Sequence, residues 1–162
     1  MSGATPVDED VQMVTFRVGG QEFALNVFEV ERVLRYRDPT PLPDAPDFLE
    51  GMLSYGESAI PVIDLRTRLS VPAETTGDTR IMVLEWEQGR IGLIVDAVVT
   101  LLRVPVEDIA MPPPLVRGLA AEYLNGIIHR DDTTILVLAV GRLLTSTEQM
   151  ALETLTAEHT HD

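Results

Sequence analysis

The fold is decided by a stretch that the chain uses twice: LEGMLSYGESAIPVIDL at residues 49–65 and LNGIIHRDDTTILVLAV at residues 124–140. Each copy has a short apolar segment, a polar turn and a second apolar segment, a pattern that predicts a β-hairpin. The aligned positions share one offset, 126 − 51 = 75, and are a glycine and aliphatic residues: Gly51 with Gly126, Ile60 with Ile135, Val62 with Val137, Leu69 with Leu144. Repetition at a fixed offset indicates a duplicated structural unit.

An earlier part of the chain is repeated as well. Residues 11–18 and 22–28 flank a Gly-Gly dipeptide, and residues 80–86 and 90–96 flank Gln-Gly. A glycine-containing turn between two apolar runs predicts a hairpin in each copy. The repeated positions are apolar, at an offset of 91 − 23 = 68: Phe23 with Ile91, Leu25 with Leu93, Val27 with Val95, Val30 with Val98, Leu34 with Leu102. Polar positions do not repeat, so a packing pattern and not a binding site has been duplicated.

The remaining segments set the boundaries of the two copies. Proline-rich linkers follow the first hairpin of each copy, and proline favours extended segments over helix interiors and central strands. We predict copy 1 over about 11–70 and copy 2 over about 79–145, each a small all-β barrel of about five short strands. The segment from Val30 to Leu34 fits either a helical turn or a bent strand. Residues 1–10 form an acidic leader that we expect to be disordered.

One helix is expected at the C-terminus, over residues 146–157. Thr145 and Glu148 are spaced as in a capping box, in which each side chain binds the other residue's backbone N–H. Met150, Leu152 and Leu155 follow at near-helical spacing and are predicted to pack against a barrel. Residues 158–162 are expected to fray.

Composition excludes several classes of protein. The 162 residues carry a net charge of −14, which argues against nucleic acid and anionic membrane surfaces as partners. The acidity serves either solubility or a partner with a basic surface. The chain has no cysteine, no secretory signal at its start and no apolar run near the roughly 20 residues of a membrane span. We therefore expect a soluble cytoplasmic protein.

Candidates for chemistry are few. No glycine pattern for a dinucleotide or a phosphate loop is present, and one histidine at a turn with two in the tail predicts neither a metal site nor any cofactor. Asp64 and Asp96 are the carboxylates that interrupt strongly apolar segments. Each could end a strand by accepting backbone N–H bonds in the following turn, contribute to an interface, or act in acid–base catalysis. A hydrolase that uses both would also need a nucleophile or an oxyanion site, and no motif supplies one.

The ordered set of these segments resembles the CheW family of chemotaxis adaptors. The matching features are the hairpin ending in FALNV, VERV at residues 30–33, Gly51 ten residues before PVIDLR, GLIVDAV at residues 92–98, EYLNG at residues 122–126 and LLTS at residues 143–146. The resemblance covers about residues 13–155. It implies two five-stranded Src-homology-3-like barrels around a shared core, with hairpins exchanged between them, and no catalysis.

The resemblance also implies two protein partners and no cofactor. A CheW-like adaptor joins the regulatory domain of a CheA-type histidine kinase to the cytoplasmic tip of a methyl-accepting chemoreceptor, and approaches the membrane only through receptor arrays. The kinase-facing residues implied are Val30, Arg32, Gly51, Ser54, Tyr55, Gly56, Glu57 and Asp64. The receptor-facing residues implied are Val27, Val95, Val98 and Val99.

The chain departs from the family pattern in two places, the turn at residues 54–57 and position 32. The family usually has Asn-Leu-Arg-Gly where this chain has Ser54 to Glu57, and it usually has Glu where this chain has Arg32. An opposite-charge pair beside the kinase contact is therefore missing. Our hypothesis is that Arg32 meets either Glu57 or a carboxylate on a dedicated partner kinase, because interface charges select partners. The alternative to a coupling adaptor is a CheW-like scaffold or competitor with altered kinase specificity.

Overall fold

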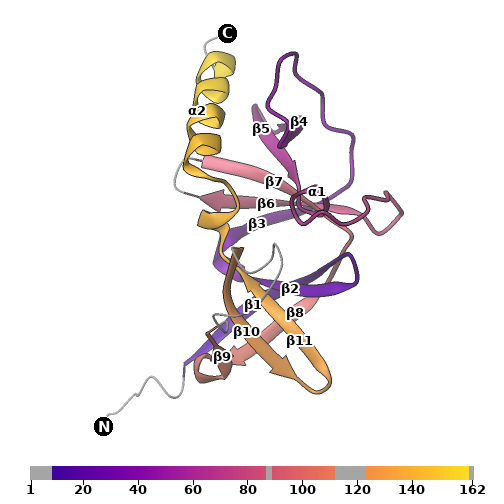
Figure 1. The fold of residues 1–162 in the computed structure, drawn as a ribbon, viewed down its shortest axis with the longest axis vertical. Helices are drawn as coiled ribbons and strands as arrows, with labels where there is room; N and C mark the ends of the chain where they lie inside the picture. Colours follow the sequence, from indigo (N-terminus) through magenta and orange to yellow (C-terminus); the bar gives the residue numbers. More distant parts are fainter. Residues whose placement is uncertain (1–8, 87–88, 112–122, 161–162) are drawn as a thin grey trace.

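The computed structural model describes residues 9–86, 89–111 and 123–160, which form two β-sheets stacked along the long axis (Figure 1). The five-stranded sheet contains, in spatial order, β3 (Val30–Arg35), β6 (Arg80–Trp86), β7 (Gly89–Val95), β5 (Ser58–Asp64) and β4 (Leu49–Tyr55). The six-stranded sheet contains β8 (Ala97–Pro105), β1 (Asp10–Val18), β2 (Gln21–Asn26), β11 (Thr133–Leu138), β10 (Leu124–Arg130) and β9 (Ile109–Ala110). The predicted all-β fold with two Src-homology-3-like barrels is confirmed, and the second barrel has one short strand more than predicted.

Each sheet contains a hairpin from the other copy of the repeat. The β1–β2 hairpin lies between β8 and β11, and the β6–β7 hairpin lies between β3 and β5. The two parallel contacts are equivalent under the repeat, because Val62 pairs with Gly92 where Val137 pairs with Ala24. Each half of the chain therefore completes its sheet only with strands from the other half.

The exchanged hairpins are apolar on both faces, because each face meets a different core. Phe23 and Leu25 pack into a cluster shared by both barrels, while Ala24 between them packs into the second barrel's own core. In β7, Leu93 joins the shared cluster and Ile94 joins the first barrel's own core. Strands buried on both faces have nearly continuous apolar sequences, which explains why the repeat was visible as apolar positions.

Local sequence sets the ends of these strands. Gly19 and Gly20 both have positive φ, 61° and 83°, as the tight turn between β1 and β2 requires. The matching turn at residues 87–88 lies outside the described residues. Strand β2 ends at Asn26, two residues earlier than expected, because the Asn26 side chain accepts the N–H of Phe28 at 2.9 Å. The short 3-10 helix η2 (Val27–Glu29) follows, and strand β3 begins at Val30. Of the two alternatives for the segment from Val30 to Leu34, the strand is therefore correct.

The C-terminal helix α2 (Ser146–Thr160) stands beside the first barrel (Figure 1) and ends three residues later than expected. The N–H of Thr145 donates to Glu148 Oε1 at 2.9 Å, and the N–H of Glu148 donates to Thr145 Oγ1 at 3.1 Å. Leu152 is buried in the shared cluster, whereas Met150 is 67% exposed, so the predicted apolar stripe is wrong at that position. The side chain of Leu155 lies outside the described residues. No helix in the described part of the chain is long and apolar enough to cross a membrane.

The substitution Thr145→Ala should lower the free energy of unfolding by about 1 kcal/mol, because it removes the side-chain half of the capping box. Urea unfolding followed by circular dichroism measures this change. Thr154→Ala, at an exposed position within the same helix, is the control and should change stability by less than about 0.5 kcal/mol. Equal stability of the two variants would show that the cap does not hold the helix.

Candidate interaction surfaces

The predicted kinase-facing residues lie on the first barrel, but not all of them reach solvent. Arg32, Ser54, Gly56 and Glu57 are exposed, and Val30 and Tyr55 are half-buried. Gly51 and Asp64 are buried, so they can support this surface but offer a partner little area. We call the six accessible residues the first-barrel surface.

Two hydrogen bonds bring the parts of this surface together. Strands β3 and β4 are the two ends of the five-stranded sheet, so closure of the barrel depends on contacts between them. Tyr55 Oη donates to Glu31 at 2.6 Å, and Arg37 Nη2 donates to the carbonyl of Ser54 at 2.9 Å. The sheet therefore closes at the hairpin turn that carries Gly56 and Glu57.

Glu31 is the centre of a polar cluster that sequence reasoning missed. Val30 pairs with Leu84 and Arg32 with Val83, which leaves Glu31 as the extra residue of a β-bulge. Its carboxylate accepts from Arg90 Nε at 2.6 Å as well as from Tyr55, and the Arg90 guanidinium lies 5.9 Å from the centre of the Tyr55 ring. A bulge re-aims a side chain, and here it directs a carboxylate onto Tyr55.

Arg32, beside this cluster, forms no ion pair within the described residues. The ion pairs among the described residues include none between Arg32 and Glu57, although both side chains are exposed. The expected contact with Glu57 is therefore absent from this structure. The Arg32 charge remains available to a partner.

The hydrogen bond from Arg90, followed by that from Tyr55, lowers the pKa of Glu31 to about 2. A lowered folded-state pKa stabilises the fold above the unfolded value of about 4.3, and this contribution is lost as the pH falls toward 2. Carbon-detected NMR of the Glu31 carboxyl should give a midpoint near 2, and Arg90→Gln should raise it. A wild-type midpoint above about 4 would show that the cluster does not hold in solution.

The predicted receptor-facing residues lie where the two barrels meet. Val95 is fully buried, Val27 and Val98 are half-buried against the shared cluster, and Val99 is 39% exposed at a bulge in β8. Two larger apolar side chains nearby in the chain were not predicted: Phe28 is 87% exposed and Leu101 is 65% exposed. Large exposed apolar side chains mark interaction sites when they gather on one surface. We call the accessible set the inter-barrel surface: Val27, Phe28, Val98, Val99 and Leu101.

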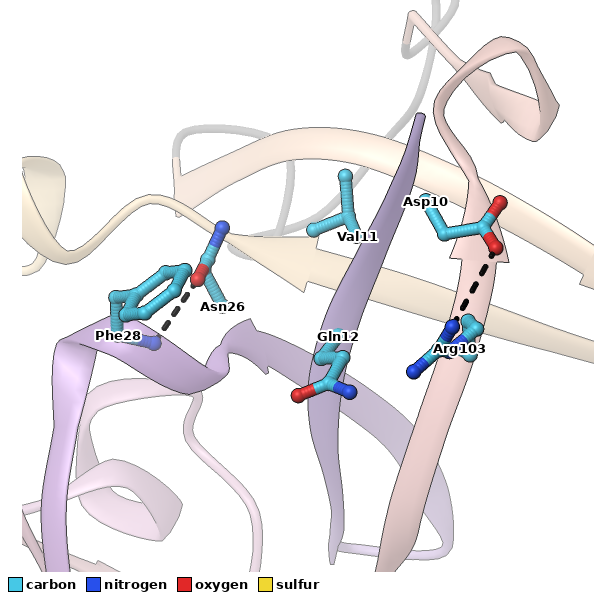
Figure 2. Close-up of a pocket in the computed structure, with 6 residues that line it drawn as sticks. All are labelled: Asp10, Val11, Gln12, Asn26, Phe28 and Arg103. Atoms are coloured by element: carbon cyan, nitrogen blue, oxygen red, sulfur yellow. Dashed lines mark hydrogen bonds and ion pairs between the residues drawn. The ribbon is translucent and has the colours of Figure 1, made fainter. Parts of the chain in front are cut away.

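A cavity of about 370 Å³ opens beside Phe28 (Figure 2). Asn26 and Phe28 lie on one side of it and Gln12 of β1 lies in the middle. Arg103 Nη1 lies 4.0 Å from Asp10 Oδ2 on the other side. Because Arg103 pairs with Gln12 and Leu101 with Val14 across β1 and β8, Arg103 and Leu101 share a strand face. The cavity therefore extends the inter-barrel surface, and polar groups line this extension.

Asp64 and Asp96 meet at one buried guanidinium. Asp64 accepts from Arg66 Nε at 2.9 Å and from Nη2 at 3.1 Å, and Asp96 accepts from Nη1 at 3.3 Å. Burial on its own would lower the pKa of Arg66, but the bonds to both carboxylates outweigh it and raise the pKa. This network links helix α1 (Leu65–Arg68) of the first barrel to the corner between β7 and β8.

Structural capping is confirmed for Asp64, which accepts the N–H of Arg66 at 2.9 Å and begins α1. Asp96 accepts the N–H of Gly19 at 2.8 Å, so its backbone partner lies in the β1–β2 hairpin. The predicted alternative in which Asp96 caps the turn after its own strand does not describe this bond. Neither aspartate lines the cavity of Figure 2. Arg66 binds both carboxylates, so its single positive charge is shared between them.

An accessible surface on one barrel, a second between the barrels and satisfied internal charges are features of a protein-interaction module. The family model described as CheW-like domain matches residues 12–148. The chain therefore belongs to the CheW family of chemotaxis scaffold proteins, which are not enzymes.

Individual relatives agree with this assignment. The chain is 29% identical to the chemotaxis protein CheW of Treponema pallidum, over 91% of this chain and 90% of that protein. It is 35% identical to protein FrzA of Myxococcus xanthus, over 85% of this chain and 87% of that protein. Among solved structures, the scaffolding protein TtCheW of Thermoanaerobacter tengcongensis matches with a TM-score of 0.75 and 30% identity, over 81% of this chain and 90% of that one.

Proposed function

We propose that this chain is an adaptor that couples chemoreceptors to a CheA-type histidine kinase. The observation that supports this is the presence of two accessible surfaces, one on the first barrel and one between the barrels. A protein whose two barrels pack on one shared core can hold two partner proteins at a fixed distance from each other. The adaptor acts in the cytoplasm and approaches the membrane only through the receptors.

On the kinase side, the first-barrel surface offers a positive charge where the family usually has a negative one. Arg32 is exposed, and the carboxylate beside it, Glu31, is already bound by Arg90 and Tyr55. Charged groups at an interface suppress wrong partners more than they add affinity. The partner kinase of this chain therefore presents a carboxylate to Arg32.

Arg32→Glu should change which kinase is bound and should leave the fold intact, because an exposed charge contributes only about 0–1 kcal/mol to stability. The measurement is a pull-down with the regulatory domain of each CheA-type kinase of the same genome. Arg130→Glu, with the same charge change at an exposed position on the other barrel, is the control. Unchanged kinase preference of Arg32→Glu would remove this proposal.

A second candidate function is that of a scaffold or competitor with altered kinase specificity. The turn between β4 and β5 favours it, since Gly56 has φ 62° and occupies the position of the family arginine. Positive φ disfavours a side chain there, so Gly56→Arg has to be combined with Glu57→Gly and Arg32→Glu. If this triple variant activates a kinase that the wild type binds without activating, the chain is a competitor.

A further inference from the structure

Arginines gather around strand β3 in a chain whose net charge is −14. Arg32 and Arg35 lie on β3, Arg37 follows it, and Arg80 lies on the neighbouring strand β6. None of these four arginines forms an ion pair within the described residues, and Glu31, the carboxylate of β3, is bound by Arg90. Strand β3 therefore carries two arginines, Arg32 and Arg35, that have no ion-pair partner in the described part of the chain.

Arg35 and Arg80 are directly opposite each other in the β3–β6 pair. Like charges at such positions are destabilising. Arg80 Nη1 is anchored by the carbonyls of Gly77 at 2.8 Å and Thr79 at 3.0 Å. Arg35 is exposed and makes neither an ion pair nor a side-chain hydrogen bond within the described part of the chain. No contact that stabilises the fold explains why an arginine occupies position 35.

Strand register shows which way this pair faces. Val33 lies two residues before Arg35, so both are on the same strand face, and Val33 pairs with Met82 of the shared cluster. Leu34 pairs with Ile81 of the first barrel's own core, on the opposite face. Val33 is itself 38% exposed. The face that carries Arg35 and Arg80 is therefore the one turned toward the inter-barrel side.

Arg32 belongs to the other face. It pairs with Val83, a residue of the first barrel's own core, as its neighbour Leu34 pairs with Ile81. Strand β3 thus divides its arginines between two directions. Arg32 is part of the first-barrel surface, and Arg35 lies on the inter-barrel side of the strand.

We propose that Arg35 and Arg80, with Val33, bind carboxylates of the receptor segment that docks between the barrels. This inference rests on the proposed function and specifies the receptor: its docked segment carries an apolar stripe flanked by acidic residues. The apolar stripe contacts the valines of the inter-barrel surface. The two guanidiniums relieve their mutual repulsion when carboxylates lie between them.

The test compares receptor affinity with fold stability. The probe is the cytoplasmic signalling fragment of a methyl-accepting receptor from the same genome, titrated by calorimetry at two salt concentrations. Arg35→Glu should bind roughly tenfold more weakly and with less salt dependence, because like charges would then face each other. Arg35→Gln should lie between this variant and the wild type. The thermal midpoint of Arg35→Glu should equal or exceed that of the wild type, since an opposite-charge pair with Arg80 replaces a like-charge pair.

Arg130→Glu is the matched control, with the same charge change at an exposed position on β10, and it should leave receptor affinity unchanged. Equal affinity of Arg35→Glu and wild type would overturn this inference while the adaptor function stands. Weaker binding of the kinase regulatory domain, with unchanged receptor affinity, would assign Arg35 to the kinase and also overturn it. Failure of the wild type to bind any receptor fragment would remove the adaptor function itself.

Discussion

Arg66→Met is expected to lower the free energy of unfolding by about 3–5 kcal/mol, because it leaves the buried carboxylate of Asp64 without a counter-charge. Arg66 is 2% exposed and Asp64 is 5% exposed, so water cannot replace the lost bonds. The same substitution frees Asp96 and the carbonyl of Glu74, which Arg66 Nη1 contacts at 2.9 Å. Since domains are stable by only about 5–15 kcal/mol, this variant should be close to unfolding at 37 °C.

Urea unfolding of the purified variants measures this loss. Arg68→Met, two residues later, removes a more accessible ion pair with Glu148 and should cost only about 0–1 kcal/mol. Asp64→Asn combined with Arg66→Met should be less destabilising than the sum of the two changes, because the buried charges are removed together. A cost below about 1 kcal/mol for Arg66→Met would show that the network contributes no more than a surface pair.

Gly51→Ala is expected to cost about 3 kcal/mol or more, because its backbone leaves no room for a side chain. A Cβ atom there would lie 2.4 Å from the carbonyl oxygen of Thr40, and Gly51 has φ 151°. Thr40 forms two backbone hydrogen bonds with Met52, at 2.8 and 2.9 Å, so the clash falls on a paired segment. This close approach explains why a glycine occupies position 51.

Gly126→Ala, at the equivalent position of the second copy, should cost less, about 1–2 kcal/mol. There the added Cβ meets Cγ2 of Ile109 at 2.6 Å, and a side chain can move aside more easily than backbone. Gly77→Ala has nothing within 4 Å of the new atom and should change stability by less than about 0.5 kcal/mol. Unfolding midpoints in this order would support the account. If Gly51→Ala keeps its stability but loses kinase binding, Gly51 is a contact residue and not a structural one.

The strand content of this fold could be predicted because apolar periodicity is a local property. The offsets of 75 and 68 located both hairpins of each copy, and the capping box located the start of α2 at Ser146. The local pattern does not show which strands pair with each other. A repeat reveals which segments are strands, but the pairing of Val62 with Gly92 joins the two copies. The expected hairpin exchange came from the family resemblance.

The interaction surfaces were predicted less completely, for physical reasons that individual residues illustrate. Glu31 meets Tyr55 and Arg90 from 24 and 59 residues away, so no spacing in the sequence signals the cluster. Phe28 was expected to continue a strand, but the Asn26 side chain turns the backbone and leaves Phe28 exposed. Side-chain capping of a short turn competes with strand formation, and an apolar run does not reveal which wins.

We propose that one chain holds a kinase and a receptor at the same time through its two surfaces. Light scattering after size-exclusion chromatography, with the kinase regulatory domain and the receptor fragment added together, tests it directly. We expect a complex with the summed mass of all three proteins. Arg32→Glu should remove only the kinase from it, and Val99→Asp should remove only the receptor. Displacement of one partner by the other from the wild-type chain would contradict the account.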